Sequence, residues 1–192
     1  AIVFETGGNR WHQFDQWPPQ NARPKNLYFH VDGKLSFDQP EAEEIASDDY
    51  ISDPNKPVPF TSDFTAGWPG HTWMIEDQRA ASTRTDVLVY QTDVLEEDIT
   101  IAGPILVNLF ASTSGTDADF FVKLIDVFPG NTADPEPNPT GAKMGGYQML
   151  VGVETMRAKY RNDFSNPEPM TPNEVTPISF NIWDKFHTFK RG

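Results

Sequence analysis

Apolar and polar residues alternate most regularly near the end of the chain. Between residues 175 and 183, Ile178, Phe180 and Ile182 occupy every second position, and polar residues or Trp183 stand between and after them. Successive side chains of a β-strand point to opposite faces, so this pattern predicts a strand with one buried face.

Other apolar runs of strand length are spread along the chain. We predict strands within residues 71–75, 86–90, 105–111, 120–128 and 147–161. The last segment contains good helix formers, but its apolar residues alternate with polar ones, which favours a strand. The run 120–128 is apolar on both faces except at Lys123 and Asp126. It therefore predicts a central strand that is covered on both sides.

Turn-forming residues separate these runs. Residues 26–37 predict a hairpin around Asp32-Gly33, a dipeptide favoured in tight primed turns. Residues 39–64 and 131–146 are rich in proline, glycine or acidic residues and predict long loops. The chain has 17 Pro and 13 Gly, so long helices are not expected. Together these signals predict an all-β fold, an antiparallel β-sandwich with long loops and little helix.

The length of 192 residues suits one domain with an N-terminal arm. Trp11, Phe14 and Trp17 are spaced by three residues, which predicts a helical or irregular turn that packs its aromatic side chains inward. We assign residues 1–25 to an arm that packs on the sandwich, and residues 26–192 to the sandwich domain.

Charge and composition limit the kinds of molecule that this chain can bind. The net charge of −13 makes nucleic acid and anionic membrane surfaces poor partners, because both require basic residues. No run of 18 apolar residues occurs, so no transmembrane helix is predicted. The N-terminus lacks the pattern of a signal peptide. The chain has no cysteine, which excludes thiol catalysis, disulfides and thiolate zinc sites.

Motifs for catalysis are missing from the sequence. A Gly-x-Ser-x-Gly nucleophile elbow does not occur, since Ser112–Gly115 lacks the first glycine. The four histidines have no zinc-binding spacing, and no glycine-rich phosphate loop is found. We therefore predict no catalytic and no cofactor-binding residue in this chain.

Asp117 and Asp119 are the remaining candidates for a site. They stand where a polar turn enters the apolar run 120–128. If both lie in the strand, they share a face and could hold calcium with loop carbonyls. Alternatively, Asp117 caps a turn and Asp119 pairs with a base such as Arg79 or Arg157. The second interpretation is the one we favour, and no other metal site is predicted.

Several segments together resemble one family. They are residues 4–11, 17–19, 27–28, 35–37, 48–59, 77–79, 86–90, 112–129, 146–148, 156–157, 160–161 and 187–189. In this order they are similar to the C-terminal jelly-roll domain, a galactose-binding-like sandwich, of the cocaine esterase and X-Pro dipeptidyl-peptidase hydrolases. The resemblance is greatest to α-amino acid ester hydrolases and glutaryl-cephalosporin acylases, and it covers nearly the whole chain.

The resemblance implies a role as an accessory domain. In that family the Ser-Asp-His triad lies on a separate N-terminal α/β-hydrolase domain, which would precede Ala1. No catalytic residue can therefore be carried over to this chain, although its parent would be a serine hydrolase of dipeptidyl-peptidase or acylase type. The implied partner is that α/β-hydrolase domain, whose active site the jelly roll helps to shape. The family also favours a periplasmic or secreted location.

Two further expectations remain open. Members of the family continue beyond Gly192 into another strand, so we expect the sandwich to lack its last strand and to pair with another copy through the exposed edge. The alternative function is a self-standing carbohydrate-binding module. Its candidate stacking residues are Trp11, Trp17, Trp68, Trp73 and Trp183.

Overall fold

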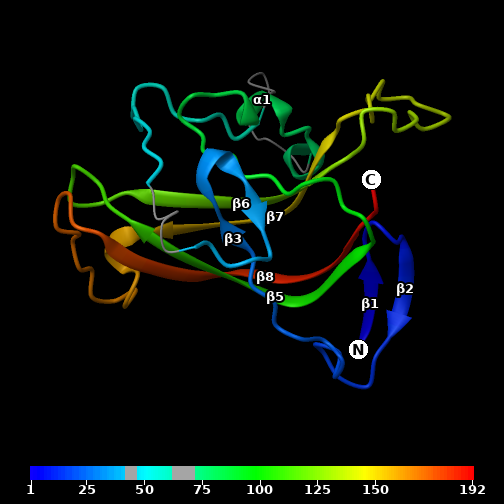
Figure 1. The fold of residues 1–192 in the computed structure, drawn as a ribbon, viewed down its shortest axis with the longest axis horizontal. Coiled ribbons are helices and arrows are strands. Elements are labelled where there is room, and N and C mark those ends of the chain that lie inside the picture. The colour runs from blue at the N-terminus through cyan, green and yellow to red at the C-terminus, as the bar shows by residue number, and fades with distance from the viewer. Residues whose placement is uncertain (42–46, 62–71) are drawn as a thin grey trace. The chain divides into compact units, whose positions relative to one another are not determined.

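The computed structural model describes residues 1–41, 47–61 and 72–192, and strands predominate in them (Figure 1). The strands are β1 (Ile2–Glu5), β2 (Arg10–Gln13), β3 (Tyr28–Phe29), β4 (Leu35–Ser36), β5 (Ile99–Ala111), β6 (Asp119–Val127), β7 (Gln148–Arg157) and β8 (Thr176–Phe189). The helical segments are η1 (Val31–Gly33), η3 (Thr72–Ile75), α1 (Arg79–Ser82) and η4 (Ala158–Tyr160). The prediction of an all-β fold with little helix is confirmed.

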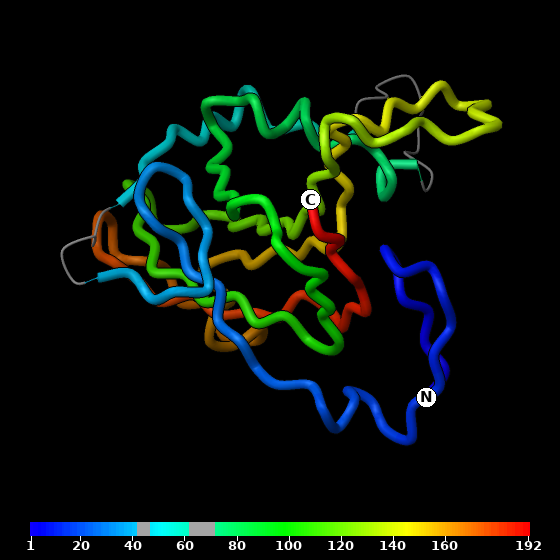
Figure 2. Tube along the Cα trace, turned by 45° about the vertical axis from the view of Figure 1, so that its right-hand side comes forward, coloured from blue at the N-terminus to red at the C-terminus, as the bar shows by residue number. Residues whose placement is uncertain are grey.

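The strands pair in twos, and the sheets are antiparallel. The pairs are β1 with β2, β3 with β4, β5 with β8, and β6 with β7. Both views of the chain show β5 and β8 running alongside each other (Figures 1 and 2). No helix within the described ranges is long and apolar enough to cross a membrane.

The chain divides into two compact units. The first comprises residues 1–22, 100–124 and 151–188, and it contains the hydrophobic core. The buried core residues are Val107, Met156, Ala158, Met170, Ile178, Phe180 and Ile182. Partly buried residues of β5 and β6 pack against them. Strands β5, β7 and β8 thus contribute buried residues to this cluster, and Ala158 of η4 and Met170 complete it.

Strand β8 confirms the alternation that the sequence showed. Ile178 and Ile182 are each 1% exposed and Phe180 is 7% exposed, whereas Trp183 is 76% exposed. The residues between the buried positions are exposed as well. Burial of three large apolar side chains from one strand face makes β8 the main contributor to the core.

Strand β6 differs from its prediction. Phe120 and Val122 pack against the core, but Phe121 is 66% exposed and Lys123 is exposed too. In the first unit, β6 is therefore covered on one face only. An apolar residue in the sequence does not reveal whether a second layer covers it, since part of any folded surface is apolar.

The second unit comprises residues 23–99, 125–150 and 189–192 and holds the predicted hairpin. β3 pairs with β4 through Tyr28↔Ser36 and Phe29↔Leu35. Asp32 and Gly33 both have positive φ, 59° and 70°, as a primed turn requires. A Cβ atom on Gly33 would approach the carbonyl oxygen of Val89 to 2.8 Å, so the position needs glycine for its surroundings as well.

Two strand predictions in the second unit are wrong. Thr72–Ile75 forms a 3-10 helix, and His71 lies outside the described residues. Residues 86–90 are not in a strand; pairing begins only at Gln91, which bridges to Lys34. There the Tyr90 ring packs against Phe29 with the ring centroids 4.4 Å apart, and its hydroxyl donates to Asp48. Side-chain contacts thus replace the strand ladder in this segment.

The ambiguous segment 147–161 resolves as predicted over most of its length. β7 extends from Gln148 to Arg157, and η4 follows. The alternation of apolar and polar residues predicted this segment correctly, although its residues favour a helix. Helix propensity is a weak predictor because packing against the rest of the protein can override it.

The core predicts a large difference between buried and exposed isoleucines. Ile178→Ala should lower the free energy of unfolding by about 2–5 kcal/mol, because a cavity forms where the side chain was 1% exposed. Ile51→Ala removes the same atoms from a side chain that is 85% exposed and should cost less than about 0.5 kcal/mol. Urea unfolding measures both. Equal losses would show that the β8 alternation does not define the core.

Candidate functional site

The first candidate site is the entry to β6, where Asp119 is held by an arginine. The Nε and Nη2 atoms of Arg157 donate to the two carboxylate oxygens of Asp119 at 2.7 and 2.9 Å. This pairing lowers the pKa of Asp119 and raises the pKa of Arg157, because it favours the charged form of each. The carboxylate therefore has its strongest contact with a fixed cation on β7.

Asp117 supports the turn beside this pair. Its Oδ1 accepts from the backbone N–H groups of Ala118 and Lys159, both at 3.1 Å. The Nζ atom of Lys159 lies 3.3 Å from Oδ2 of Asp117. Asp119 thus pairs with Arg157, one of the two bases that the sequence analysis named, while Asp117 accepts from the backbone of its turn and lies near Lys159. Within the described ranges, no group of three or more histidine or carboxylate side chains gathers as a metal site would require.

Arg79, the other proposed base, lies elsewhere in the second unit. It pairs with Asp77 and donates to the carbonyl oxygens of Lys143 and Gly145. Asp77 also accepts from the backbone N–H of Gln148. Arg79 therefore stabilises a loop of the second unit.

A buried carboxylate in the N-terminal hairpin is the second candidate site. Glu5, at the end of β1, is 1% exposed. Its Oε1 accepts from the hydroxyl of Thr188 at 2.5 Å. Its Oε2 accepts from Nε of Arg10 at 2.8 Å and lies 2.5 Å from Nε2 of His12. We call these residues, Glu5, Arg10, His12 and Thr188, the Glu5 cluster.

The hairpin register and its turn explain how Glu5 reaches β8. β1 pairs with β2 so that Glu5 stands opposite Arg10. Between them, Gly7 adopts φ 76°, and a Cβ atom there would lie 2.0 Å from the carbonyl oxygen of Thr188. A Cβ atom on Gly8 would lie 2.1 Å from Oε1 of Glu5. Only two glycines allow the turn to approach both the carboxylate and β8 this closely.

The electrostatics of the Glu5 cluster favour the ionised carboxylate. The hydrogen bond from Thr188, followed by that from Arg10, lowers the pKa of Glu5 to about 2, and they outweigh the opposing effect of burial. A general acid or base works best with a pKa near the operating pH. Glu5 is therefore suited to a structural role, in which it fastens the hairpin to β8.

The hydrogen bonds around the Glu5 cluster extend to His187 of β8 and to Thr6, which follows β1. The Oγ1 of Thr6 lies 2.8 Å from Nδ1 of His187, and Thr6 and Thr188 share a backbone hydrogen bond of 2.9 Å. A hydroxyl beside a histidine is also the arrangement of a nucleophile and its base. His187 is 1% exposed, however, whereas Thr6 is exposed, and their contact joins the turn after β1 to β8.

The sequence did not single out the Glu5 cluster as a site. A signal was present, because Glu5, Arg10 and His12 are the polar positions that alternate with Phe4 and Trp11. The structure shows that Arg10 and His12 converge on Glu5, which bonds to Thr188 of β8, whereas Trp11 is 69% exposed. Arg10–Gln13 forms a strand, whereas the spacing of Trp11, Phe14 and Trp17 had predicted a helical or irregular turn.

The tryptophans proposed for carbohydrate binding lie in different surroundings. In the first unit, Trp11 and Trp183 are exposed, whereas Trp17 is half-buried, packs against Phe186 and donates its indole N–H to Asp184 at 2.6 Å. In the second unit, Trp73 packs against Phe60. Trp68 lies outside the described residues.

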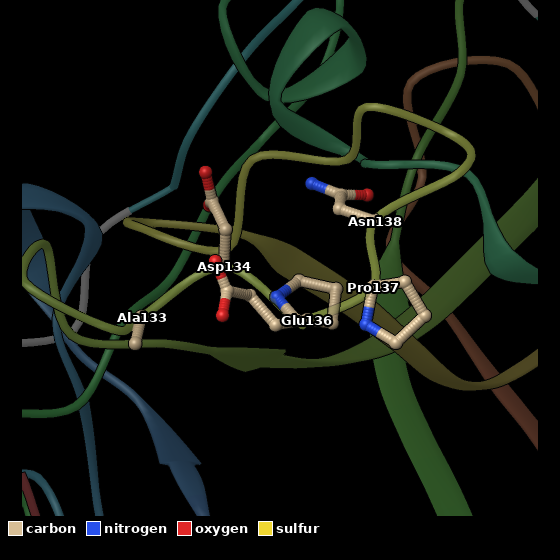
Figure 3. A pocket seen from close by; sticks show the side chains of 6 residues that line it. Ala133, Asp134, Glu136, Pro137 and Asn138 are labelled. Atoms are coloured by element: carbon tan, nitrogen blue, oxygen red, sulfur yellow. The ribbon is translucent and has the colours of Figure 1, made fainter.

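A hollow in the second unit is formed by a single loop (Figure 3). It is lined by Ala133, Asp134, Pro135, Glu136, Pro137 and Asn138. Asp134 accepts from Lys143 and from the backbone N–H of Met144, and the Asn138 side chain bonds both backbone groups of Ala142. The polar side chains of this loop therefore fix its own conformation.

These features describe an all-β domain whose buried and paired charges stabilise packing. The chain belongs to the family described as the X-Pro dipeptidyl-peptidase C-terminal non-catalytic domain, which it matches over residues 1–192. The resemblance that the sequence motifs indicated is thus confirmed.

Larger hydrolases contain similar domains. Cocaine esterase of Rhodococcus sp. (strain MB1 Bresler) is 28% identical over 200 residues, which is 99% of this chain and 32% of the esterase. An aminopeptidase from the marine sediment archaeon Thaumarchaeota archaeon, which has a crystal structure, is 41% identical in sequence to this chain, and the two structures align with a TM-score of 0.89. An α-amino acid ester hydrolase is 38% identical, with a TM-score of 0.90. This chain is covered completely by both structures but spans only 31% of each.

The contacts of Asp117 and Asp119 predict that calcium does not stabilise the domain. EDTA should leave the melting temperature unchanged, because a ligand stabilises a protein only if it binds the native state. Differential scanning fluorimetry with EDTA, and with added calcium as the converse test, measures this. A decrease with EDTA that calcium reverses would restore the metal interpretation.

The Glu5 cluster predicts a specific pH dependence. The pKa of Glu5 lies below the ordinary glutamate value, so its contribution to stability is present at neutral pH and is lost as the pH falls from 4.5 towards about 2. That contribution is at most roughly 3 kcal/mol, from the size of the shift. Glu5→Gln should be less stable at pH 7 and should lose less stability on acidification than the unmodified chain.

A matched control is available in the first unit. Glu174 is exposed, and Glu174→Gln should leave the dependence of stability on pH close to that of the unmodified chain. Urea unfolding between pH 7 and pH 2.5 measures all three proteins. If Glu5→Gln follows the same curve as Glu174→Gln, the cluster does not hold a charged carboxylate.

Proposed function

We propose that this chain is the accessory C-terminal jelly-roll domain of a larger α/β serine hydrolase. The observation that carries the proposal is its complete alignment with 31% of an α-amino acid ester hydrolase at 38% identity. A domain this similar is expected to have the same place in its own polypeptide. Its role is to support the catalytic domain and to help shape the wall of the active site.

The side chains of the first unit support a non-catalytic role. Glu5 is ionised and buried, His187 is buried, and Asp119 is engaged by Arg157. Each of these groups contacts a segment distant in sequence, which supports a structural role for them and a reaction on another part of the polypeptide.

The named relatives favour a class of substrate. The two structures with the higher identity are an aminopeptidase and an α-amino acid ester hydrolase, and cocaine esterase has a lower identity. We therefore propose esters or amides of amino acids, including X-Pro peptides, as substrates of the parent enzyme. A single Ser-His-Asp mechanism serves both esters and amides, because both proceed through an acyl-enzyme.

This proposal predicts where the activity resides. The isolated chain should hydrolyse p-nitrophenyl esters and amino-acid p-nitroanilides no faster than buffer. The complete polypeptide that contains this domain should hydrolyse amino-acid derivatives. Deletion of residues 1–192 from it should reduce its kcat/KM for these substrates. Turnover by the isolated chain that persists through purification, or a complete polypeptide without a hydrolase domain, would overturn the proposal.

A further inference from the structure

The outward side of the β5–β8 pair carries three large and exposed apolar side chains. On β5, Leu106 and Phe110 are 61% and 81% exposed, and they alternate with core positions such as Val107. On β8, Trp183 is 76% exposed and follows the buried Ile182. We use the name β5–β8 outer face for the outward residues Leu106, Asn108, Phe110, Ser179, Asn181 and Trp183.

These residues form one surface across two strands. The hydroxyl of Ser179 donates to Oδ1 of Asn108 at 2.8 Å, so the outward positions of β5 and β8 are side by side. Period-two alternation along each strand then places Leu106 and Phe110 on either side of Asn108. The face therefore has a hydrogen-bonded polar centre with large apolar side chains around it.

The β5–β8 outer face has no charged residue in its six positions. In a chain with 22% charged residues, six positions of average composition would carry only about one charge, so the absence of charge characterises the face together with its large apolar residues. Exposed strand faces are normally kept soluble by charged side chains, as Lys123 does beside Phe121 on β6. The buried centre of a protein–protein interface typically has few charged residues and is enriched in Trp and Phe, as this face is. Contiguous exposed apolar residues also indicate contact with another protein surface.

We propose that the β5–β8 outer face is the surface on which the catalytic domain of the same polypeptide packs. This inference rests on the proposed function and specifies its docking surface. The related hydrolases are about three times as long as the matched segment, which spans 31–32% of them. A body of about twice this domain's size is thus available in one chain, where tethering gives it a high effective concentration.

The uncharged character of the face favours this occupant over a second copy of the chain. Two copies with a net charge of −13 each repel one another on approach, whereas a tethered domain is held close regardless of charge. A surface without charges also suits a permanent contact, because no ion has to be desolvated when the two domains meet. Phe110 and Trp183 are the side chains that would fill pockets of the catalytic domain, as buried aromatic residues do at the centres of interfaces.

Cysteine labelling tests the proposal directly, because the chain contains no cysteine. Phe110→Cys introduces a thiol on the face, and Phe164→Cys introduces a matched one, since Phe164 is 79% exposed in the same unit and belongs to neither β5 nor β8. Both variants are made in the complete polypeptide, and maleimide labelling is followed by peptide mass spectrometry.

The thiol of the Phe110→Cys variant should be labelled at least about tenfold more slowly than that of the Phe164→Cys variant in the native enzyme, because its reaction requires the domains to separate. After denaturation the two rates should be equal. Equal rates in the native enzyme would overturn the proposal. Slow labelling that becomes fast on dilution would assign the face to a second copy and would also overturn it.

A charge on the face provides an independent test. Phe110→Lys in the complete polypeptide should reduce kcat/KM at least about tenfold and should increase cleavage by trypsin between the domains, since a lysine cannot be buried unpaired in the contact. Phe164→Lys should change neither. If Phe110→Lys is harmless while Trp11→Lys abolishes activity, the docking surface lies on the N-terminal hairpin instead.

The two proposals fail in different ways. If residues 1–192 can be deleted without loss of kcat/KM, the accessory function is wrong. If the deletion abolishes activity but Phe110→Lys retains it and the thiol of Phe110→Cys is labelled rapidly, the function is correct and the docking surface is wrong.

Discussion

The buried carboxylate of Glu5 is the constraint around which the N-terminal hairpin and the end of β8 are built. A charge with 1% exposure must be compensated within the protein, and its partners come from β2 and β8. That requirement fixes the hairpin register, because Glu5 and Arg10 have to stand opposite each other. It also fixes the turn, since only glycine fits at positions 7 and 8 against Thr188 and the carboxylate.

Strand β8 joins this polar cluster to the apolar core. Its first half buries Ile178, Phe180 and Ile182, and its last residues, His187 and Thr188, bind the hairpin. Both kinds of contact depend on the same strand having the correct register. The charged groups of the first unit are therefore used to hold elements together, which is consistent with membership in a family of non-catalytic domains.

Local patterns were informative wherever one residue type or one periodicity dominated. Asp32-Gly33 specified its turn because both residues tolerate positive φ. The alternation at 178–182 specified a half-buried strand, and that at 148–157 outweighed good helix formers. The apolar runs 72–75 and 86–90 were misleading, because a short run without alternation fits a strand, a 3-10 turn or an extended loop equally well.

The sequence by itself determined the fold class, the family and the exclusion of recognisable catalytic motifs, because these depend on local periodicity and on ordered motifs. It also favoured an ion pair for Asp119 over a calcium site, with a base such as Arg79 or Arg157 as the partner. Only the tertiary structure decided between those partners, revealed the burial of Glu5 against Thr188, and showed that β6 is exposed at Phe121. Each of these depends on segments distant in sequence: Glu5 and Thr188 are 183 residues apart. Burial and pairing are properties of such contacts, and no local pattern specifies them.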